Sequence, residues 1–175
     1  MKKFTTTAAA MSVALALFFC TAAKAQTTAA ANPWRLGIGL EAGIPTGNAN
    51  DISDFEIGGT ARLQYDAAKT VAVILTSGYY DMIGKGAANG GTYPSLGMVP
   101  VKLGAKIYVA PTFYLDGEAG AGFDTSYENH TKLILSPGVG YDSKTWDISL
   151  RYENYSGENN SFGLVGLRVA YGFAL

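Results

Sequence analysis

Cysteine and histidine are almost absent from this 175-residue chain, which has one of each, Cys20 and His130, and six prolines. A single cysteine excludes a disulfide-stapled fold. The 13 basic and 14 acidic residues nearly cancel, and no basic patch indicates nucleic-acid binding. Glycine (22) and tyrosine (11) are plentiful, while helix-forming residues are scarce beyond the first thirty positions. This composition predicts a single all-β domain.

The first 25 residues have the three parts of a secretory signal peptide. Lys2 and Lys3 supply the positive charge, an apolar stretch runs to Cys20, and small residues surround an expected cleavage site after Ala25. The apolar run is shorter than the ~20 residues of a membrane-spanning helix. Cleavage would leave a short linker, residues 26–33, ahead of the main domain, residues 34–175, and would remove the only cysteine.

From Trp34 onward, apolar and polar residues alternate with a period of two, which is typical of β-strands with one apolar face. In the first segment Trp34, Leu36 and Ile38 fall on one face, and Arg35 and Gly37 fall on the other. Eight such segments are predicted, over residues 34–45, 55–66, 70–81, 98–109, 113–124, 132–142, 146–155 and 163–175.

The connections between these segments alternate in length. Residues 46–54, 82–97, 125–131 and 156–162 are long and polar, whereas 67–69, 110–112 and 143–145 are tight. Outer-membrane barrels have this asymmetry, with short periplasmic turns and longer outer loops. The pattern therefore predicts an all-β, eight-stranded, antiparallel, up-and-down transmembrane β-barrel.

Glycine indicates which face of each strand points into this barrel. Twelve strand glycines share the face with the charged residues, and three share the apolar face. Because an eight-stranded lumen is barely wide enough for side chains, the bulky apolar face must point outward to lipid. A periplasmic carrier barrel, which is apolar inside, is therefore disfavoured. Aromatic residues near the short turns are expected to form an interfacial girdle: Trp34, Tyr65, Phe113, Tyr141, Trp146 and Phe173.

The inward face then receives seven basic and nine acidic side chains. Because an unpaired buried charge is costly, we expect them to form a structural ion-pair network that closes the lumen. The alternative is a narrow aqueous path in which the same charges select a small solute or ion. The residues are Arg35, Arg62, Lys102, Lys106, Lys132, Arg151, Arg168, Glu41, Glu56, Asp66, Asp116, Glu118, Asp124, Asp142, Asp147 and Glu153.

Two stretches of the chain resemble a known family. Residues 99–106 (VPVKLGAK) and 113–122 (FYLDGEAGAG), within the strand pattern of residues 34–175, are similar to porin-family proteins with an "outer membrane protein beta-barrel domain". The resemblance implies a minimal barrel of the OmpA and OmpX type, mostly without an assigned activity. It also implies that the barrel assembly machinery recognises the last strand, although Leu175 stands where that signal usually has an aromatic residue.

Other patterns indicate little chemistry. Residues 37–42 match a loose dinucleotide-binding pattern, but no helix follows to hold a pyrophosphate. His130 lies in a long loop near Ser126 and Asp124, which are residue types that lipid-modifying outer-membrane enzymes use, yet nothing in the spacing brings them together. No loop has the regular carboxylate spacing of a calcium site, so we expect neither metal nor cofactor.

The sequence thus predicts an exported, non-catalytic outer-membrane protein of a Gram-negative bacterium, with a structural or surface-interaction role. A narrow porin-like channel is the first alternative, and a lipid-modifying enzyme is the second. The expected partners are outer-membrane lipid, lipopolysaccharide and the barrel assembly machinery. An external ligand at the glycine-rich loop 82–97 is a further expectation, because exposed loops often carry binding sites.

Overall fold

The computed structural model describes residues 33–47, 53–86, 94–125, 131–143, 145–157 and 161–175. The predicted signal peptide, and all of the predicted linker except Pro33, lie outside these ranges. Eight strands account for most of the described residues: β1 (Trp34–Thr46), β2 (Ser53–Ala68), β3 (Val71–Gly84), β4 (Leu96–Tyr108), β5 (Phe113–Asp124), β6 (Thr131–Asp142), β7 (Trp146–Ser156) and β8 (Ser161–Ala174). In the described ranges no helix is long and apolar enough to cross a membrane.

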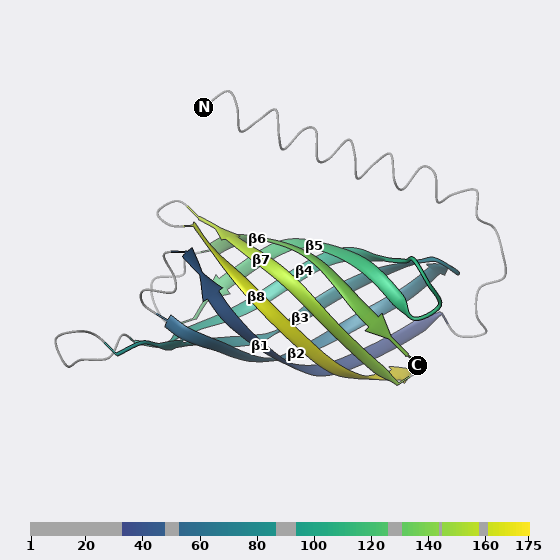
Figure 1. Cartoon of the computed structure of the whole chain (residues 1–175), viewed down its shortest axis with the longest axis horizontal. Helices are drawn as coiled ribbons and strands as arrows, with labels where there is room; N and C mark the ends of the chain where they lie inside the picture. The colour runs from purple at the N-terminus through teal and green to yellow at the C-terminus, as the bar shows by residue number, and fades with distance from the viewer. Residues whose placement is uncertain (1–32, 48–52, 87–93, 126–130, 144, 158–160) are drawn as a thin grey trace, which may run out of the picture.

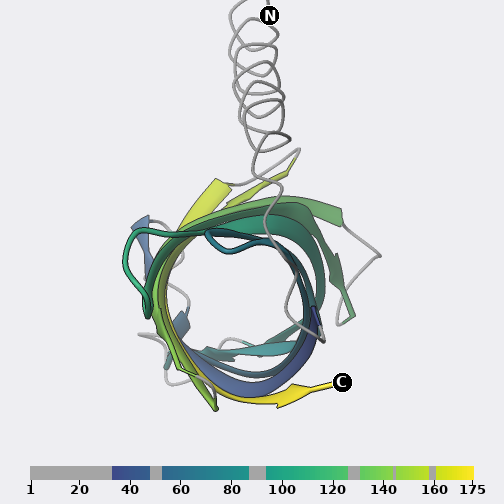
Figure 2. The ribbon, with the colours of Figure 1, turned by 90° about the vertical axis from the view of Figure 1, so that its right-hand side faces the viewer.

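The strands form a closed antiparallel barrel in which each strand pairs with its neighbours in the sequence and β8 pairs with β1. They slope across the barrel in side view (Figure 1) and form a ring in end view (Figure 2). The predicted eight-stranded up-and-down topology is confirmed. The β2–β3, β4–β5 and β6–β7 turns lie at the end that holds the C-terminus, which we call the turn end; the opposite end is the loop end.

The stagger of the barrel is the shift along one strand after a full circuit through paired residues. A path that starts at Leu36 returns to β1 at Thr46, ten residues further along the same strand (46 − 36 = 10). This stagger on eight strands is consistent with a strand tilt of about 35–45° and an interior that side chains can fill. The path runs through Leu63, Leu75, Leu103, Ala119, Leu135, Asn154 and Gly163.

The strand bounds differ from the sequence prediction chiefly in the β2–β3 hairpin. β2 begins at Ser53 and β3 continues to Gly84, so the hairpin extends further at the loop end than predicted. The pairing of β2 with β3 shifts register between Ser53 and Phe55 and between Asp66 and Ala68. A register shift breaks the alternation of apolar and polar residues, which is why the pattern did not extend through these positions.

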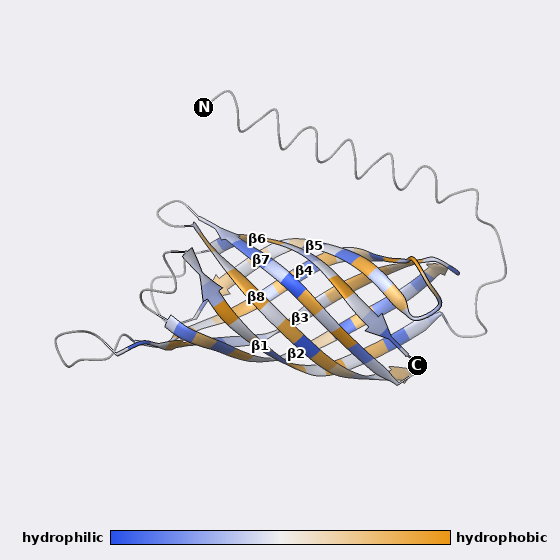
Figure 3. Ribbon diagram, in the orientation of Figure 1, coloured by the Kyte–Doolittle hydropathy of each residue, from blue (hydrophilic) through white to orange (hydrophobic). Residues whose placement is uncertain are grey.

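Large apolar side chains cover the outside of the barrel. Leu40 is 70% exposed and Leu103 is 60% exposed, whereas their neighbours Glu41 and Lys102 are buried. In Figure 3, apolar and polar residues alternate along the strands. The outward direction of the bulky face is confirmed, and a carrier barrel for an apolar ligand would have the opposite arrangement.

Aromatic side chains gather on the outside near the turn end. They lie in contact across neighbouring strands, as expected of an interfacial girdle. The ring centroids are 4.8 Å apart in Trp34–Tyr65, 5.4 Å in Phe113–Tyr141 and 5.5 Å in Trp146–Tyr171.

Two prolines coincide with gaps in the strand pairing. Pro100 in β4 keeps its partner on β5, but the β3–β4 pairing lapses beside it. Pro137 in β6 also keeps its partner on β5, while the β6–β7 pairing lapses beside it. Since proline has no N–H to donate, each gap falls where a ladder hydrogen bond is missing.

Candidate functional site

Buried charged side chains fill the lumen from the turn end through its middle. They project from every strand except β3, because alternate residues of each strand point inward. A buried charge is tolerated only when other groups compensate it, so the contacts decide what this site can do. The buried charged residues are Glu41, Glu56, Arg62, Lys102, Lys106, Asp116, Glu118, Asp142, Asp147, Arg151, Glu153 and Arg168.

Asp142 anchors the network at the turn end, where β6 stops. Its Oδ1 accepts a hydrogen bond from Arg35 Nη1 at 3.0 Å. Its Oδ2 accepts from Lys106 Nζ at 3.0 Å and from the Tyr108 hydroxyl at 2.6 Å. Arg35 is the most exposed member of this group, and its Nη2 also donates to the carbonyl oxygen of Ser143 in the β6–β7 turn. Both carboxylate oxygens of Asp142 are therefore engaged.

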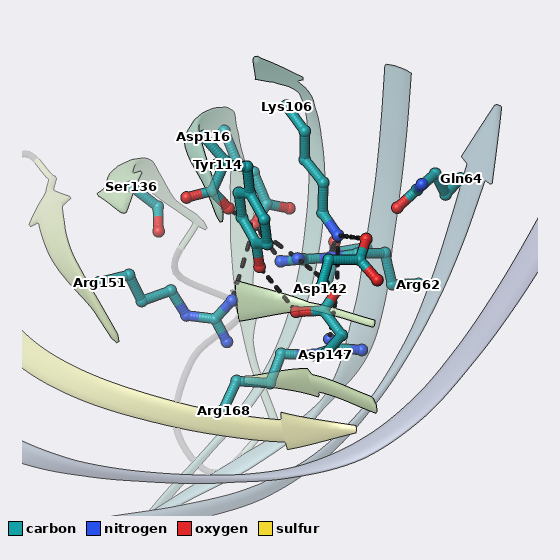
Figure 4. A network of polar contacts seen from close by, with 12 residues as sticks. Arg62, Gln64, Lys106, Tyr114, Asp116, Ser136, Asp142, Asp147, Arg151 and Arg168 are labelled. Carbon is teal, nitrogen blue, oxygen red and sulfur yellow. Dashed lines mark hydrogen bonds and ion pairs between the residues drawn. The ribbon is translucent and has the colours of Figure 1, made fainter. Parts of the chain in front are cut away.

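Asp147 forms the second centre of the turn end (Figure 4). It accepts from the Tyr114 hydroxyl at Oδ1 and from Lys106 Nζ at Oδ2, both at 2.6 Å. Arg62 and Arg168 approach the same Oδ2 atom, at 3.8 and 3.6 Å. Lys106 thus links two carboxylates, while the two guanidinium groups interact with Asp147 at longer range.

Arg62 and Arg151 connect the strands across the middle of the lumen. Arg62 donates to Glu118 at 2.6 Å through Nη2 and to Thr76 at 2.9 Å through Nε. Arg151 lies 3.6 Å from the same Glu118 oxygen and forms an ion pair with Glu41. These contacts join β1, β2, β3, β5 and β7 through side chains alone.

Side chains from four strands contact the carboxylate of Glu41. Thr60 donates to its Oε1 at 2.7 Å, and the Tyr80 hydroxyl donates to its Oε2 at 2.9 Å. Arg168 Nε lies 3.4 Å from Oε1 and donates to the Thr60 hydroxyl at 3.1 Å. With Arg151, these partners leave Glu41 fully compensated although it is buried.

Glu153 is the corresponding centre nearer the loop end. Lys102 and the Tyr155 hydroxyl both hydrogen-bond to it, and Arg151 Nε lies 3.2 Å from its Oε1. Lys102 also donates to the Tyr80 hydroxyl at 3.0 Å, which links Glu153 to the Glu41 group. The ion pairs therefore form one connected network rather than isolated bridges.

An apolar layer replaces these charges at the loop end of the lumen. We call it the loop-end cluster; its members are Tyr80, Met82, Met98, Ile134, Tyr155, Phe162 and Leu164. The rings of Tyr155 and Phe162 stack with centroids 4.7 Å apart. The cluster lies between the ion-pair network and the outer loops, so the filling of the lumen changes from charged to apolar along the barrel axis.

Glu56 is the exception among the buried charged residues of the described ranges. It is 1% exposed and pairs in register with Met82 of the loop-end cluster. Its Oε2 has no hydrogen-bond partner, and no ion pair is recorded for it among the described residues. Glu56 therefore lies in the lumen without joining the ion pairs of the described residues, because the side chains around this level are mostly apolar.

Lumen glycines allow this dense filling. A Cβ on Gly120 would lie 2.0 Å from the carbonyl oxygen of Val101, and one on Gly104 would lie 2.2 Å from that of Gly117. A side chain at either position would push neighbouring strands apart. The segregation of glycine to the inward face therefore reflects close backbone contacts as well as room for long charged side chains.

The structure joins twelve of the sixteen predicted network residues in ion pairs. Asp66 instead accepts a hydrogen bond from Gln64, and Lys132 lies over the ring of Phe162. The twelve are Arg35, Glu41, Arg62, Lys102, Lys106, Asp116, Glu118, Asp142, Asp147, Arg151, Glu153 and Arg168. Polar partners such as Thr60, Tyr80 and Tyr114 were missed, although their inward parity was available in the sequence. The loop-end cluster was missed as well, because its apolar residues share the inward parity that was predicted for charged residues and glycines.

No catalytic constellation is evident in the described ranges. Asp124 is half-buried near the loop end, but His130 and Ser126, its imagined partners, lie outside the described residues. No group of three or more His, Cys, Asp or Glu residues in the described part of the chain could hold a metal ion. The lumen chemistry that can be described is ion pairing and hydrogen bonding.

Comparison with known proteins gives structural likeness alone: neither a family model nor a curated sequence matches. Ail of Yersinia pestis aligns with a TM-score of 0.60 and 15% identity, over 81% of this chain and 99% of Ail. The N-terminal β-barrel domain of Pseudomonas aeruginosa OprF aligns with a TM-score of 0.57 and 12% identity, over 79% of this chain and 97% of that domain. A de novo designed transmembrane β-barrel aligns with a TM-score of 0.52 and 18% identity, over 83% of this chain and 100% of the designed chain.

These neighbours are small eight-stranded barrels of the outer-membrane type, and this chain has their fold. The likeness agrees with the resemblance to the OmpA and OmpX type. A designed barrel shares the fold as well, so the fold by itself does not specify an activity. Function must be argued from the lumen and the surfaces of this chain.

Proposed function

We propose that the protein resides in the bacterial outer membrane as a closed, non-catalytic barrel with a structural or surface-interaction role. The filling of the lumen carries this proposal. Ion pairs connect the strands from the turn end to the middle, and the loop-end cluster follows them. Conduction needs a hydrated path, and side chains that bind one another across the lumen oppose its formation.

Single-channel recording in planar lipid bilayers tests this proposal against the porin-like alternative. The purified protein is expected to give no steady, ohmic openings, because the buried charges of its lumen, apart from Glu56, are already paired. A general porin reconstituted in the same bilayers is the positive control. Steady openings that scale with voltage in the wild-type protein would favour a narrow channel instead.

Mass spectrometry of lipid A tests the non-catalytic part of the proposal. Cells that express the protein and cells that lack it are expected to show the same acylation and phosphorylation pattern. An altered pattern would revive the lipid-modifying alternative. The variant His130→Ala would then show whether the only histidine of the chain is needed.

The proposed partners follow from the surfaces that the barrel presents. Its apolar exterior fits outer-membrane lipid and lipopolysaccharide, and β8, with its outward apolar residues, is the strand that the barrel assembly machinery would recognise. The connection predicted as loop 82–97, which begins after Gly84 of β3 and ends before Leu96 of β4, would bind an external ligand; its residues 87–93 lie outside the described ranges. Deletion of residues 87–93 should abolish surface binding while leaving barrel assembly intact.

A further inference from the structure

A small cavity of about 20 Å³ lies at the turn end of the lumen, lined by Arg35, Gly37, Arg62, Gln64, Asp147 and Gly172. Gly37 and Gly172 are partners across the β1–β8 seam, so two adjacent strands offer no side chain at this point. The missing side chains leave the space open. Its volume is enough for one species about the size of a water molecule.

Three guanidinium nitrogens near this cavity have no hydrogen-bond acceptor among the described residues. They are Nη1 of Arg62 and both Nη1 and Nη2 of Arg168. Arg62 is 2% exposed, and Arg168 is 0% exposed. Arg62 lines the cavity, and a Cβ on Gly37 would lie 3.4 Å from Arg168 Nη2, so both guanidinium groups reach the same region. A buried charged donor without an acceptor costs about 1–3 kcal/mol or more.

The nearest carboxylate does not satisfy these donors. Both oxygens of Asp147 already accept short hydrogen bonds, from Tyr114 and Lys106. Asp147 Oδ2 is 3.8 Å from Arg62 Nη1 and 3.6 Å from Arg168 Nη1, which is too far for a hydrogen bond. Figure 4 shows Arg62, Arg168 and Asp147 converging from three strands.

Other acceptors in this region are engaged or distant. Asp142 is occupied at both oxygens by Arg35, Lys106 and Tyr108. Asp116 Oδ2 lies 3.9 Å from Arg62 Nη1. The groups left without a partner beside the cavity are all charged donors, Arg62 Nη1 and the two terminal nitrogens of Arg168, so the position calls for an acceptor.

We propose that this cavity binds one small monovalent anion of halide size. Arg62 Nη1 and the Arg168 terminal nitrogens donate to it, and Arg35 lies at the turn-end side. Such an anion accepts several hydrogen bonds at once from charged donors. The proposal assigns a ligand to the lumen and is independent of the proposed structural or surface-interaction role.

Thermal unfolding in two salts tests the site. The midpoint of the gel-migration shift on heating is measured in sodium chloride and in sodium gluconate at equal ionic strength, since gluconate is too large for the cavity. We expect the wild-type midpoint to be several degrees higher in chloride. Equal midpoints in the two salts would overturn the proposal.

Matched glycine variants test whether the chloride-specific shift arises at this cavity. Gly37→Val fills the cavity and should abolish the chloride-specific shift. Gly37→Ala adds one methyl at an ordinary contact distance, and should reduce the shift if the larger variant does not fold. Gly59→Val is the control, because a Cβ at this outward position meets no atom within 4 Å, and it should keep the full shift. A full shift in either Gly37 variant contradicts the site.

Anomalous diffraction from crystals grown in sodium bromide provides an independent measurement. A bromide peak between Arg62 and Arg168 that is absent from Gly37→Val crystals supports the proposal. Water density alone at that position in bromide-grown wild-type crystals would refute it.

Discussion

Two glutamates in the lumen differ in their surroundings although both are almost fully buried. Glu153 has Lys102, Arg151 and Tyr155 as partners, whereas the Oε2 atom of Glu56 has none among the described residues. Removing a buried charge that has partners is destabilising, because the partners are left unpaired. Removing a buried polar group that has no partner can be stabilising, because its desolvation penalty disappears. Substitutions at these two positions should therefore act in opposite directions.

Replacement of Glu153 should destabilise the barrel. Glu153→Gln keeps the shape of the side chain but leaves Lys102 and Arg151 without their carboxylate. We expect a loss of about 3–5 kcal/mol in the free energy of unfolding, the range for breaking a buried ion pair. Urea unfolding in lipid vesicles, followed by tryptophan fluorescence, measures it. Asp54→Asn, which removes the partially exposed pair with Lys85, is the control and should change little.

Replacement of Glu56 should stabilise the barrel. Glu56→Met puts an apolar side chain of similar length beside Met82 and removes the unpartnered oxygen. The same unfolding measurement should show a gain of about 1–3 kcal/mol, the usual cost of an unsatisfied buried polar group. A loss of stability in this variant would mean that Glu56 has a partner that the described residues do not include.

At the scale of strands, glycine and proline determine how the barrel wall closes. Gly120 and Gly117 both belong to β5 and face opposite sides of it. Gly120→Ala would place a methyl 2.0 Å from a backbone oxygen of β4, whereas a Cβ at Gly117 meets nothing within 4 Å. We expect Gly120→Ala to lower the free energy of unfolding by about 1–3 kcal/mol through overpacking. Gly117→Ala, the control from the same strand, should not reduce it.

Pro137 should weaken the β6–β7 seam by a single missing donor. Pro137→Ala supplies an N–H where the pairing lapses, which should contribute about 0.5–1.5 kcal/mol as a new ladder hydrogen bond. Any proline substitution also gives the unfolded chain more freedom, at a cost of about 0.4–1 kcal/mol. Pro111→Ala isolates that cost, because Pro111 lies in the exposed β4–β5 turn, outside the strand ladders. Pro137→Ala should be the more stable of the two variants.

Strand number, topology and inward parity could be predicted because the hydrophobic period and the loop lengths are local properties of the sequence. The β2–β3 hairpin was predicted too short, since the register shift near Ser53 breaks that period. Which lumen charges meet depends on the stagger of the whole barrel, so the joining of Arg62 to Glu118 or of Lys102 to Glu153 could not be read from spacing. Glu56 shows the same limit, because the apolar cluster at its level of the lumen comes from five other strands.

At the scale of the whole molecule, the barrel is polar inside, apolar outside and asymmetric along its axis. The turn end carries the aromatic girdle and the small cavity, while the loop end carries the apolar cluster and the long connections. Short turns face the periplasm in barrels of this class. This asymmetry therefore predicts a single orientation in the outer membrane, with the loop end outside the cell.

Cysteine labelling in intact cells tests that orientation, since the mature chain is expected to lack its only native cysteine, Cys20. Ser95→Cys places a thiol at an exposed position of the loop end, and Ala110→Cys places one in the exposed β4–β5 turn. A membrane-impermeant maleimide should label the first variant in intact cells and the second only after the outer membrane is permeabilised. Because the turn end is closed by the Asp142 and Asp147 ion pairs, the reagent should not reach Ala110→Cys through the lumen. Labelling of Ala110→Cys alone in intact cells would reverse the orientation, and with it the side from which an anion would reach the turn-end cavity.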